Sequence, residues 1–223
     1  MNVLRAASVL SLAAALLAAV STASAVPVLQ YQVLDGATVI GSGATTAGII
    51  SISGSDARFS TVGGFASSAP TLAVPDFSTS VFSIQSAASA SAATLTIRVC
   101  ATGLTGYAGG NVASVLTLNS LNGGPFASGT VSTYFDNNNV AYGTGTPLAT
   151  RTYTGLNTFS DSSTTSTSPS ALFSETAIYT LNYGAGGSST ISASSQVNAV
   201  PEPATMAALG LGAVALLKRR KNA

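Results

Sequence analysis

Short runs of β-branched and aromatic residues alternate along the chain with runs of Gly, Pro, Asn and Ser, a pattern typical of strands and turns. The clearest alternation covers residues 94–101, where Leu95, Ile97, Val99 and Ala101 share one face and polar residues occupy the other. We therefore predict a half-buried strand there. The same pattern predicts further strands at residues 29–34, 49–53, 58–62, 81–85, 112–118, 131–135, 177–183 and 190–197.

Glycine-rich and asparagine-rich turns separate these segments, and no convincing amphipathic helix lies between them. The predicted fold is all-β, an antiparallel β-sandwich of jelly-roll-like type. Residues 160–170 are mostly Ser and Thr, and we predict an exposed, flexible loop there. Residues 86–93, all Ser and Ala, are expected to form a connection or the edge of the following strand.

The first 25 residues have the layout of a secretory signal peptide. Arg5 supplies the positive start, residues 6–20 are apolar, and Ala23 and Ala25 form an A-x-A cleavage site. The mature chain is expected to begin near Val26. With residues 200–223 also set aside as a signal, the β-rich ectodomain spans residues 26–199, a length that suits one domain.

The last residues combine three features in a fixed order. Pro201, Glu202 and Pro203 come first, then an uncharged apolar run over residues 204–217, then the basic cluster. The cations of that cluster are Lys218, Arg219, Arg220 and Lys221. As a helix the apolar run would be about 21 Å long, which is shorter than the roughly 30 Å hydrocarbon core of a bilayer. The side chains of the basic cluster can extend to the lipid headgroups and so lengthen the span. Their positive charges would hold that end of the helix on the cytoplasmic side. We predict one C-terminal membrane helix that is a weak, removable anchor.

This order resembles the PEP-CTERM sorting signal of exported bacterial proteins, over about a tenth of the chain. The resemblance implies export across the inner membrane, transient anchoring there by the helix, and processing at or near Pro201, Glu202 and Pro203 by an exosortase, a transpeptidase-like membrane enzyme. It also implies a Gram-negative host that makes exopolysaccharide and biofilms. The expected destination is the cell surface or the medium.

Charge excludes one class of partner. The ectodomain has no lysine, and its three arginines oppose six acids, so its net charge is about −3. It lacks the cationic surface that phosphate backbones require, and nucleic acid is not an expected partner. Exopolysaccharide remains a candidate partner, since the polar surface is made of hydroxyls and amides.

Few residues in the ectodomain can perform chemistry. The chain has no histidine, which removes the commonest general base and metal ligand. Cys100 is the only cysteine. It lies on the more polar face of its predicted strand beside Arg98, which could lower the pKa of the thiol. We favour an inert thiol over an intermolecular disulfide. Asp136 and the three asparagines after it form a weak Ca²⁺ candidate, for which a hairpin turn is the competing explanation.

We therefore expect a non-enzymatic surface or extracellular-matrix protein, with no cofactor and no catalytic residues. Two alternatives stay open. One is a secreted glycoside hydrolase that uses a carboxylate pair, for which two acids must converge about 5 to 10 Å apart in a cleft. The other is a glycan-binding adhesin.

Overall fold

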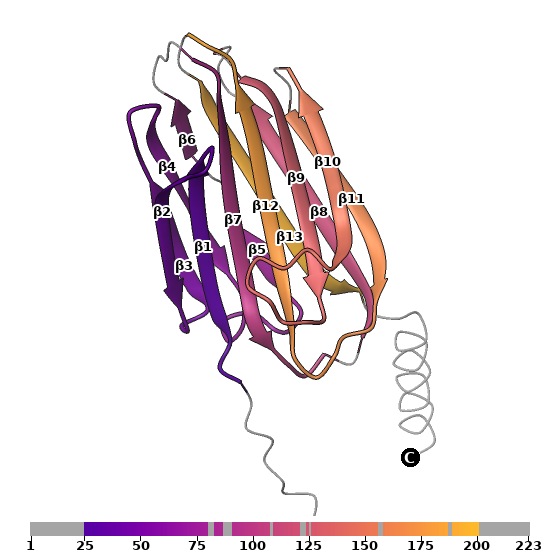
Figure 1. The fold of residues 1–223 in the computed structure, drawn as a ribbon. Coiled ribbons are helices and arrows are strands. Elements are labelled where there is room, and N and C mark those ends of the chain that lie inside the picture. The colour runs from indigo at the N-terminus through magenta and orange to yellow at the C-terminus, as the bar shows by residue number, and fades with distance from the viewer. Residues whose placement is uncertain are drawn as a thin grey trace, which may run out of the picture.

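The computed structural model describes residues 25–79, 83–86, 91–107, 109–120, 124, 126–155, 158–186 and 189–200. Thirteen strands in these ranges form two antiparallel sheets that lie face to face (Figure 1). No helix occurs among the described residues, which confirms the all-β prediction. Within the same ranges no helix is long and apolar enough to cross a membrane.

One sheet has six strands in the order β10-β9-β12-β7-β1-β2. Every neighbouring pair in it is antiparallel. The strands are β1 (Val28–Asp35), β2 (Thr38–Thr45), β7 (Ala93–Leu104), β9 (Phe126–Asp136), β10 (Thr146–Thr154) and β12 (Phe173–Tyr183).

The second sheet has seven strands, with the order β11-β8-β13-β5-β4-β3 and a short strand β6 that pairs with β13 and β4. From β7 onward, most connections pass from one sheet to the other (Figure 1). The strands are β3 (Ile49–Gly54), β4 (Phe59–Ser67), β5 (Phe77–Thr79), β6 (Ser83–Ser86), β8 (Gly110–Ser120), β11 (Thr158–Thr167) and β13 (Thr190–Val200).

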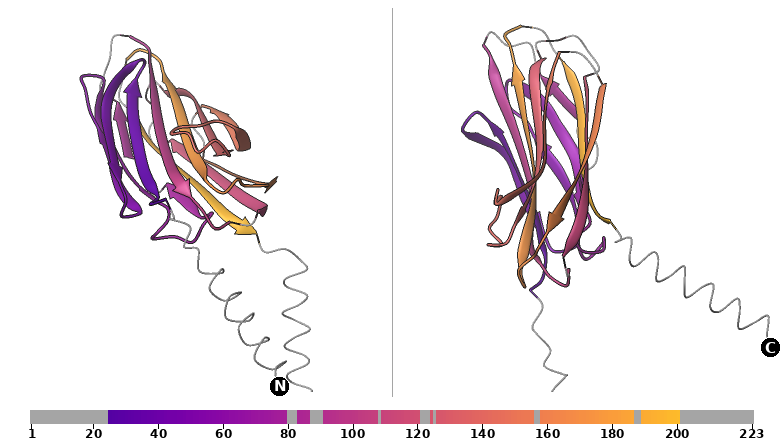
Figure 2. Two further views of the ribbon diagram at one scale, coloured as in Figure 1. Left: turned by 60° about the horizontal axis from the view of Figure 1, so that its bottom comes forward. Right: turned by 90° about the vertical axis from the view of Figure 1, so that its right-hand side faces the viewer.

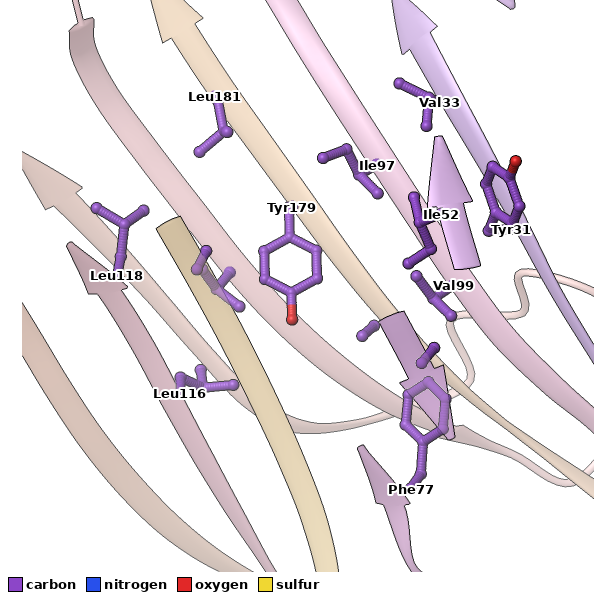
Figure 3. Close-up of a cluster of buried hydrophobic side chains, with 14 of the residues drawn as sticks. Tyr31, Val33, Ile52, Phe77, Ile97, Val99, Leu116, Leu118, Tyr179 and Leu181 are labelled. Carbon is purple, nitrogen blue, oxygen red and sulfur yellow. The ribbon is translucent and has the colours of Figure 1, made fainter. Parts of the chain in front are cut away.

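The hydrophobic core fills the space between the two sheets. Alternation along β7 buries Leu95, Ile97 and Val99 completely, as the sequence predicts. Figure 3 shows Ile97 and Val99 facing the same interior as the ring of Tyr179 from β12. The Tyr179 hydroxyl donates a hydrogen bond to Ser195 Oγ of the opposite sheet at 2.9 Å, so a polar contact also joins the layers.

Every predicted strand coincides with an observed one where the structure describes it. Residues 81 and 82 of the predicted segment 81–85 lie outside the described ranges, and β6 covers the rest. Four strands, β2, β5, β10 and β11, carry too few consecutive apolar residues to be predicted. In β2 two of the positions are glycines because there is no room for a side chain: a Cβ at Gly41 would lie 2.0 Å from the carbonyl oxygen of Ser53.

The prediction of a flexible loop over residues 160–170 is wrong. Residues 158–167 form β11, which pairs in unbroken register with β8. The hydroxyls on the inward face of β11 have hydrogen-bond partners: Ser163 Oγ and Thr165 Oγ1 donate to the carbonyl oxygen of Leu148 in β10 at 2.8 and 3.0 Å. An edge strand can therefore be built almost wholly from Ser and Thr.

Both described ends of the chain lie at the same end of the molecule (Figures 1 and 2). The strands alternate in direction, so β1 runs away from that end and β13 returns to it. We call it the terminal end. The turn after Asp35 and the loop before Phe59 lie at the opposite, distal end.

Candidate functional site

At the distal end two of the six ectodomain carboxylates, those of Asp35 and Asp56, accept hydrogen bonds from Arg58. Arg58 Nε donates to Asp35 Oδ2 at 2.5 Å, while Asp56 Oδ1 accepts the backbone N–H groups of Arg58 and Phe59 at 2.8 and 2.7 Å. Burial raises the pKa of the Asp35 carboxyl above its ordinary value, Arg58 opposes that rise, and the Asp56 carboxyl adds to it. The two acids thus differ in role: Asp35 is buried and ion-paired, whereas Asp56 closes an exposed turn.

A cavity of about 390 Å³ adjoins this ion pair. Its walls include Asp35, Arg58, Thr94 and Asn182. The Thr94 hydroxyl donates to Asn182 Oδ1 at 3.0 Å, and Asn182 Nδ2 donates to Ser128 Oγ at 3.0 Å. The polar groups of this wall are therefore largely bonded to one another.

A second cavity, of about 410 Å³, lies between the edge strands β10 and β11. Arg151 of β10 and Asp161 of β11 form an ion pair across it. Both side chains are substantially exposed, so this ion pair contributes little to stability, on the order of 0 to 1 kcal/mol.

Glu175 is an acid of a different kind. It shares the interior face of β12 with Tyr179 and is fully buried, and neither carboxyl oxygen has a hydrogen-bond partner in the structure. Burial raises the pKa of Glu175 well above its ordinary value, and the charge of Asp76 raises it further. Burial therefore favours the neutral carboxylic acid over the carboxylate, and the side chain has no exposed surface with which to meet a substrate.

Asp76 lies at the terminal end, in the loop before β5. Its Oδ1 accepts a hydrogen bond from the backbone N–H of Ala199 at 3.2 Å. Ala199 is the penultimate residue of β13, the last strand that the structure describes. The Asp76 carboxylate therefore restrains the C-terminal end of β13.

The sequence predicts that Cys100 lies on the more polar face of its strand and that Arg98 could lower its pKa. The placement is correct, and the direction of the pKa shift is wrong. Cys100 does lie on the outer face of β7, but it is completely buried and free. Burial raises the pKa of its thiol, against opposing contacts from Thr176 and the backbone of Tyr142. The segment between β9 and β10, which carries Tyr142, approaches this part of the sheet, and such a contact is not visible in a strand pattern.

Asp136 uses its carboxylate to shape a turn. Its Oδ1 accepts the backbone N–H of Asn138 at 2.9 Å, as in an Asx-turn. Asn137 instead reaches Ser168 and Ser170, and Asn139 Oδ1 accepts the N–H of Gly103 at 2.7 Å. The oxygens of this run therefore bond in different directions, and no cluster of three or more acidic, Cys or His ligands occurs among the described residues.

The predicted sorting residues lie outside the described ranges. These are Pro201, Glu202, Pro203, the apolar run 204–217 and the basic cluster Lys218, Arg219, Arg220 and Lys221. Ala23 of the predicted cleavage site also lies outside them, while Ala25 is the first residue that the structure describes.

Two contacts of acidic residues were not predicted from sequence. The Asp56-x-Arg58 spacing is a local signal, because Asp often accepts backbone N–H groups two and three residues ahead. Asp76 and Ala199 are 123 residues apart, and no sequence pattern could have paired them.

Comparison with known proteins identifies the C-terminal end. The model of the PEP-CTERM protein-sorting motif matches residues 199–221. The chain is therefore a PEP-CTERM sorting domain-containing protein, as the resemblance indicated. The motif implies export through the membrane, sorting to the cell surface and an exosortase-type processing partner.

The other two comparisons cover curated proteins and solved structures. No curated protein matches the chain. Among solved structures, that of infectious bursal disease virus strain Gx has 13% sequence identity and a TM-score of 0.31, with 79% of this chain and 52% of that chain covered. The active domain of tailspike protein 4 from bacteriophage CBA120 has 12% identity, a TM-score of 0.27 and coverage of 72% and 18%.

An Arthrobacter globiformis T6 isomalto-dextranase complexed with panose has 11% identity and a TM-score of 0.26, with 74% of this chain and 32% of that chain covered. This chain thus spans about half the length of the viral protein and less of the other two. TM-scores this low establish neither a shared fold nor a shared activity.

Proposed function

We propose that this protein is a non-enzymatic component of the cell surface or extracellular matrix, displayed as a jelly-roll-like β-sandwich after exosortase processing of its tail. The observation that carries the proposal is the sorting motif at residues 199–221, whose first two residues are the last two of β13. Association with exopolysaccharide in a biofilm is part of the proposal, since the domain surface is rich in hydroxyls and poor in charge.

The contacts of the carboxylates support a non-enzymatic role. Asp35 and Asp161 are ion-paired, and Asp56 and Asp136 cap turns. The remaining two are Asp76, bonded to Ala199, and the fully buried Glu175. A hydrolytic pair needs one acid that donates a proton and one carboxylate that attacks or activates water. Each of these six acids already has a structural contact or lacks access to solvent.

Intact-mass and terminal-peptide analysis of the protein from its native culture, with cells, membranes and medium separated, tests the sorting step. We expect a species that begins near Val26, ends close to Pro201 and is found outside the inner membrane. The triple variant Pro201→Ala/Glu202→Ala/Pro203→Ala is expected to accumulate unprocessed in the inner membrane. A wild-type protein that keeps Lys218 to Lys221 in the inner membrane would contradict the proposal, because the helix would then be a permanent anchor.

A second assay addresses the matrix role. The purified domain is incubated with exopolysaccharide from the same culture, and both bound protein and released reducing sugar are measured. Binding without release of sugar is the expected result. Release of reducing ends that is lost in the variant Asp35→Asn or Asp56→Asn would instead establish the hydrolase alternative.

A further inference from the structure

No spacer separates the folded domain from the sorting signal. β13 remains paired with β8 up to its last residue, Val200, which lies opposite Asn111. The sorting motif begins at residue 199, so its first two residues belong to the strand. Pro201 is the next residue in the chain.

On its other side, β13 loses its strand partner before it ends. β5 pairs only with Ser195, Gln196 and Val197, because β5 begins at Phe77. Continuing that antiparallel register would place Ala199 opposite Pro75, which precedes β5 and is not paired with β13. The ladder with β5 therefore supplies no backbone carbonyl acceptor for the N–H of Ala199.

The Asp76 carboxylate takes the place of that missing partner. Its Oδ1 accepts the N–H of Ala199 at 3.2 Å, and Asp76 is held half-buried by the loop that leads into β5. A hydrogen bond to a charged acceptor is stronger than a neutral one. This one restrains the end of β13 two residues before Pro201.

A membrane enzyme that cleaves a peptide must receive it as an accessible segment of several residues, and residues paired in a sheet are accessible only after local opening. The residues before Pro201 are paired on both sides of β13, with β8 and with Asp76. Access therefore depends on how often the end of β13 unpairs.

We propose that Asp76 positions the sorting signal by holding the end of β13, and that this contact limits the rate at which an exosortase-type enzyme gains access to Pro201, Glu202 and Pro203. The inference rests on the proposed function, because it assumes that the tail is processed. Asp76 is a positioning residue in this scheme and takes no part in the chemistry.

The test compares Asp76→Ala with Asp76→Asn in the full-length protein in its native host. Loss of the acceptor is expected to increase the open population of the β13 end, and with it the rate of processing, about fivefold, the effect of a single hydrogen bond. Asn keeps an amide oxygen that can accept the same bond, but more weakly because it is uncharged, so Asp76→Asn should process at a rate between those of the wild type and Asp76→Ala. The measurement is a pulse-chase of precursor and processed forms by intact mass.

Asp56→Ala is the matched control. Asp56 also accepts backbone N–H groups, but it does so in the loop before β4 at the distal end, whereas β13 finishes at the terminal end. Its loss should leave processing at the wild-type rate. In the purified Asp76→Ala protein, the Ala199 amide should exchange hydrogen faster while the melting temperature stays close to wild type. Processing of Asp76→Ala that is unchanged or slower would overturn the inference.

A second variant removes any dependence on the folding of Asp76→Ala. A Gly-Ser spacer of about six residues inserted between Val200 and Pro201 should accelerate processing and make it insensitive to the residue at position 76. A spacer without effect would overturn the inference. If the triple variant of Pro201, Glu202 and Pro203 blocks processing while Asp76→Ala and the spacer do nothing, only the positioning role fails. If that triple variant is processed normally, the proposed function itself fails.

Discussion

Glu175 shows most clearly how one residue can make stability depend on pH. The neutral acid is the form that the interior tolerates, because burial raises its pKa well above the ordinary value. Between the pKa of the unfolded chain, about 4.3, and the raised pKa of the folded chain, the folded state binds one proton more. The free energy of unfolding therefore falls as pH rises through that window.

The variant Glu175→Gln tests this directly. Gln has a similar shape and does not ionise, so the variant should melt a few °C above the wild type at pH 8. The difference should become small towards pH 4, where Glu175 is neutral in the folded state and mostly neutral in the unfolded state. Thermal unfolding followed by circular dichroism at a series of pH values provides the measurement.

Asp56→Asn is the control for this experiment, since it makes the same chemical change at an exposed turn. It should not show the rise in relative stability between pH 4 and pH 8. A Glu175→Gln variant whose advantage is as large at pH 4 as at pH 8 would show that titration of Glu175 is not the cause.

At the scale of elements, β10 and β11 show how two polar edge strands are joined. They belong to different sheets, and the hydroxyls of Ser163 and Thr165 reach from β11 to the carbonyl oxygen of Leu148 in β10. These bonds also occupy an acceptor on an edge strand, which would otherwise be free to pair with another chain.

The double variant Ser163→Ala/Thr165→Val removes both donors. We expect a loss of about 1 to 2 kcal/mol in the free energy of unfolding, because each hydrogen bond contributes about 0.5 to 1.5 kcal/mol. Urea denaturation provides the measurement. The control Ser162→Ala/Thr164→Val makes the same changes on the exposed face of β11 and should lie within about 0.5 kcal/mol of wild type. Equal losses in both pairs would mean that the contact with Leu148 is unimportant.

At the scale of the whole molecule, the described residues form one hydrophobic core between two sheets. The core residues extend from Leu29 to Val197, and β13 completes its pairing at Val200. We expect a protein of residues 26–200 to fold alone and to unfold in one cooperative step. The single cysteine, Cys100, is buried and free, so a reducing agent should not change the melting temperature.

Calorimetry of this shortened protein, with and without dithiothreitol, checks both expectations. A melting temperature that falls on reduction would reveal a disulfide between chains. A protein that fails to fold without residues 201–223 would show that the tail contributes to the domain and is more than a signal.

The sequence by itself determined the class of fold, because β-branched alternation and turn residues follow from local geometry along the chain. It determined the PEP-CTERM identity as well, since Pro201 to Lys221 carry the signal as a linear order of residues. Tertiary structure alone decided three further features: the strand at residues 158–167, the burial of Cys100 and the contact of Asp76. Residues 158–167 become a strand because β8 and Leu148 supply their partners, and Cys100 is buried on an outer face. Asp76 meets Ala199 across 123 residues of chain. These outcomes depend on contacts between distant segments, and local residue patterns do not encode which distant segments will meet.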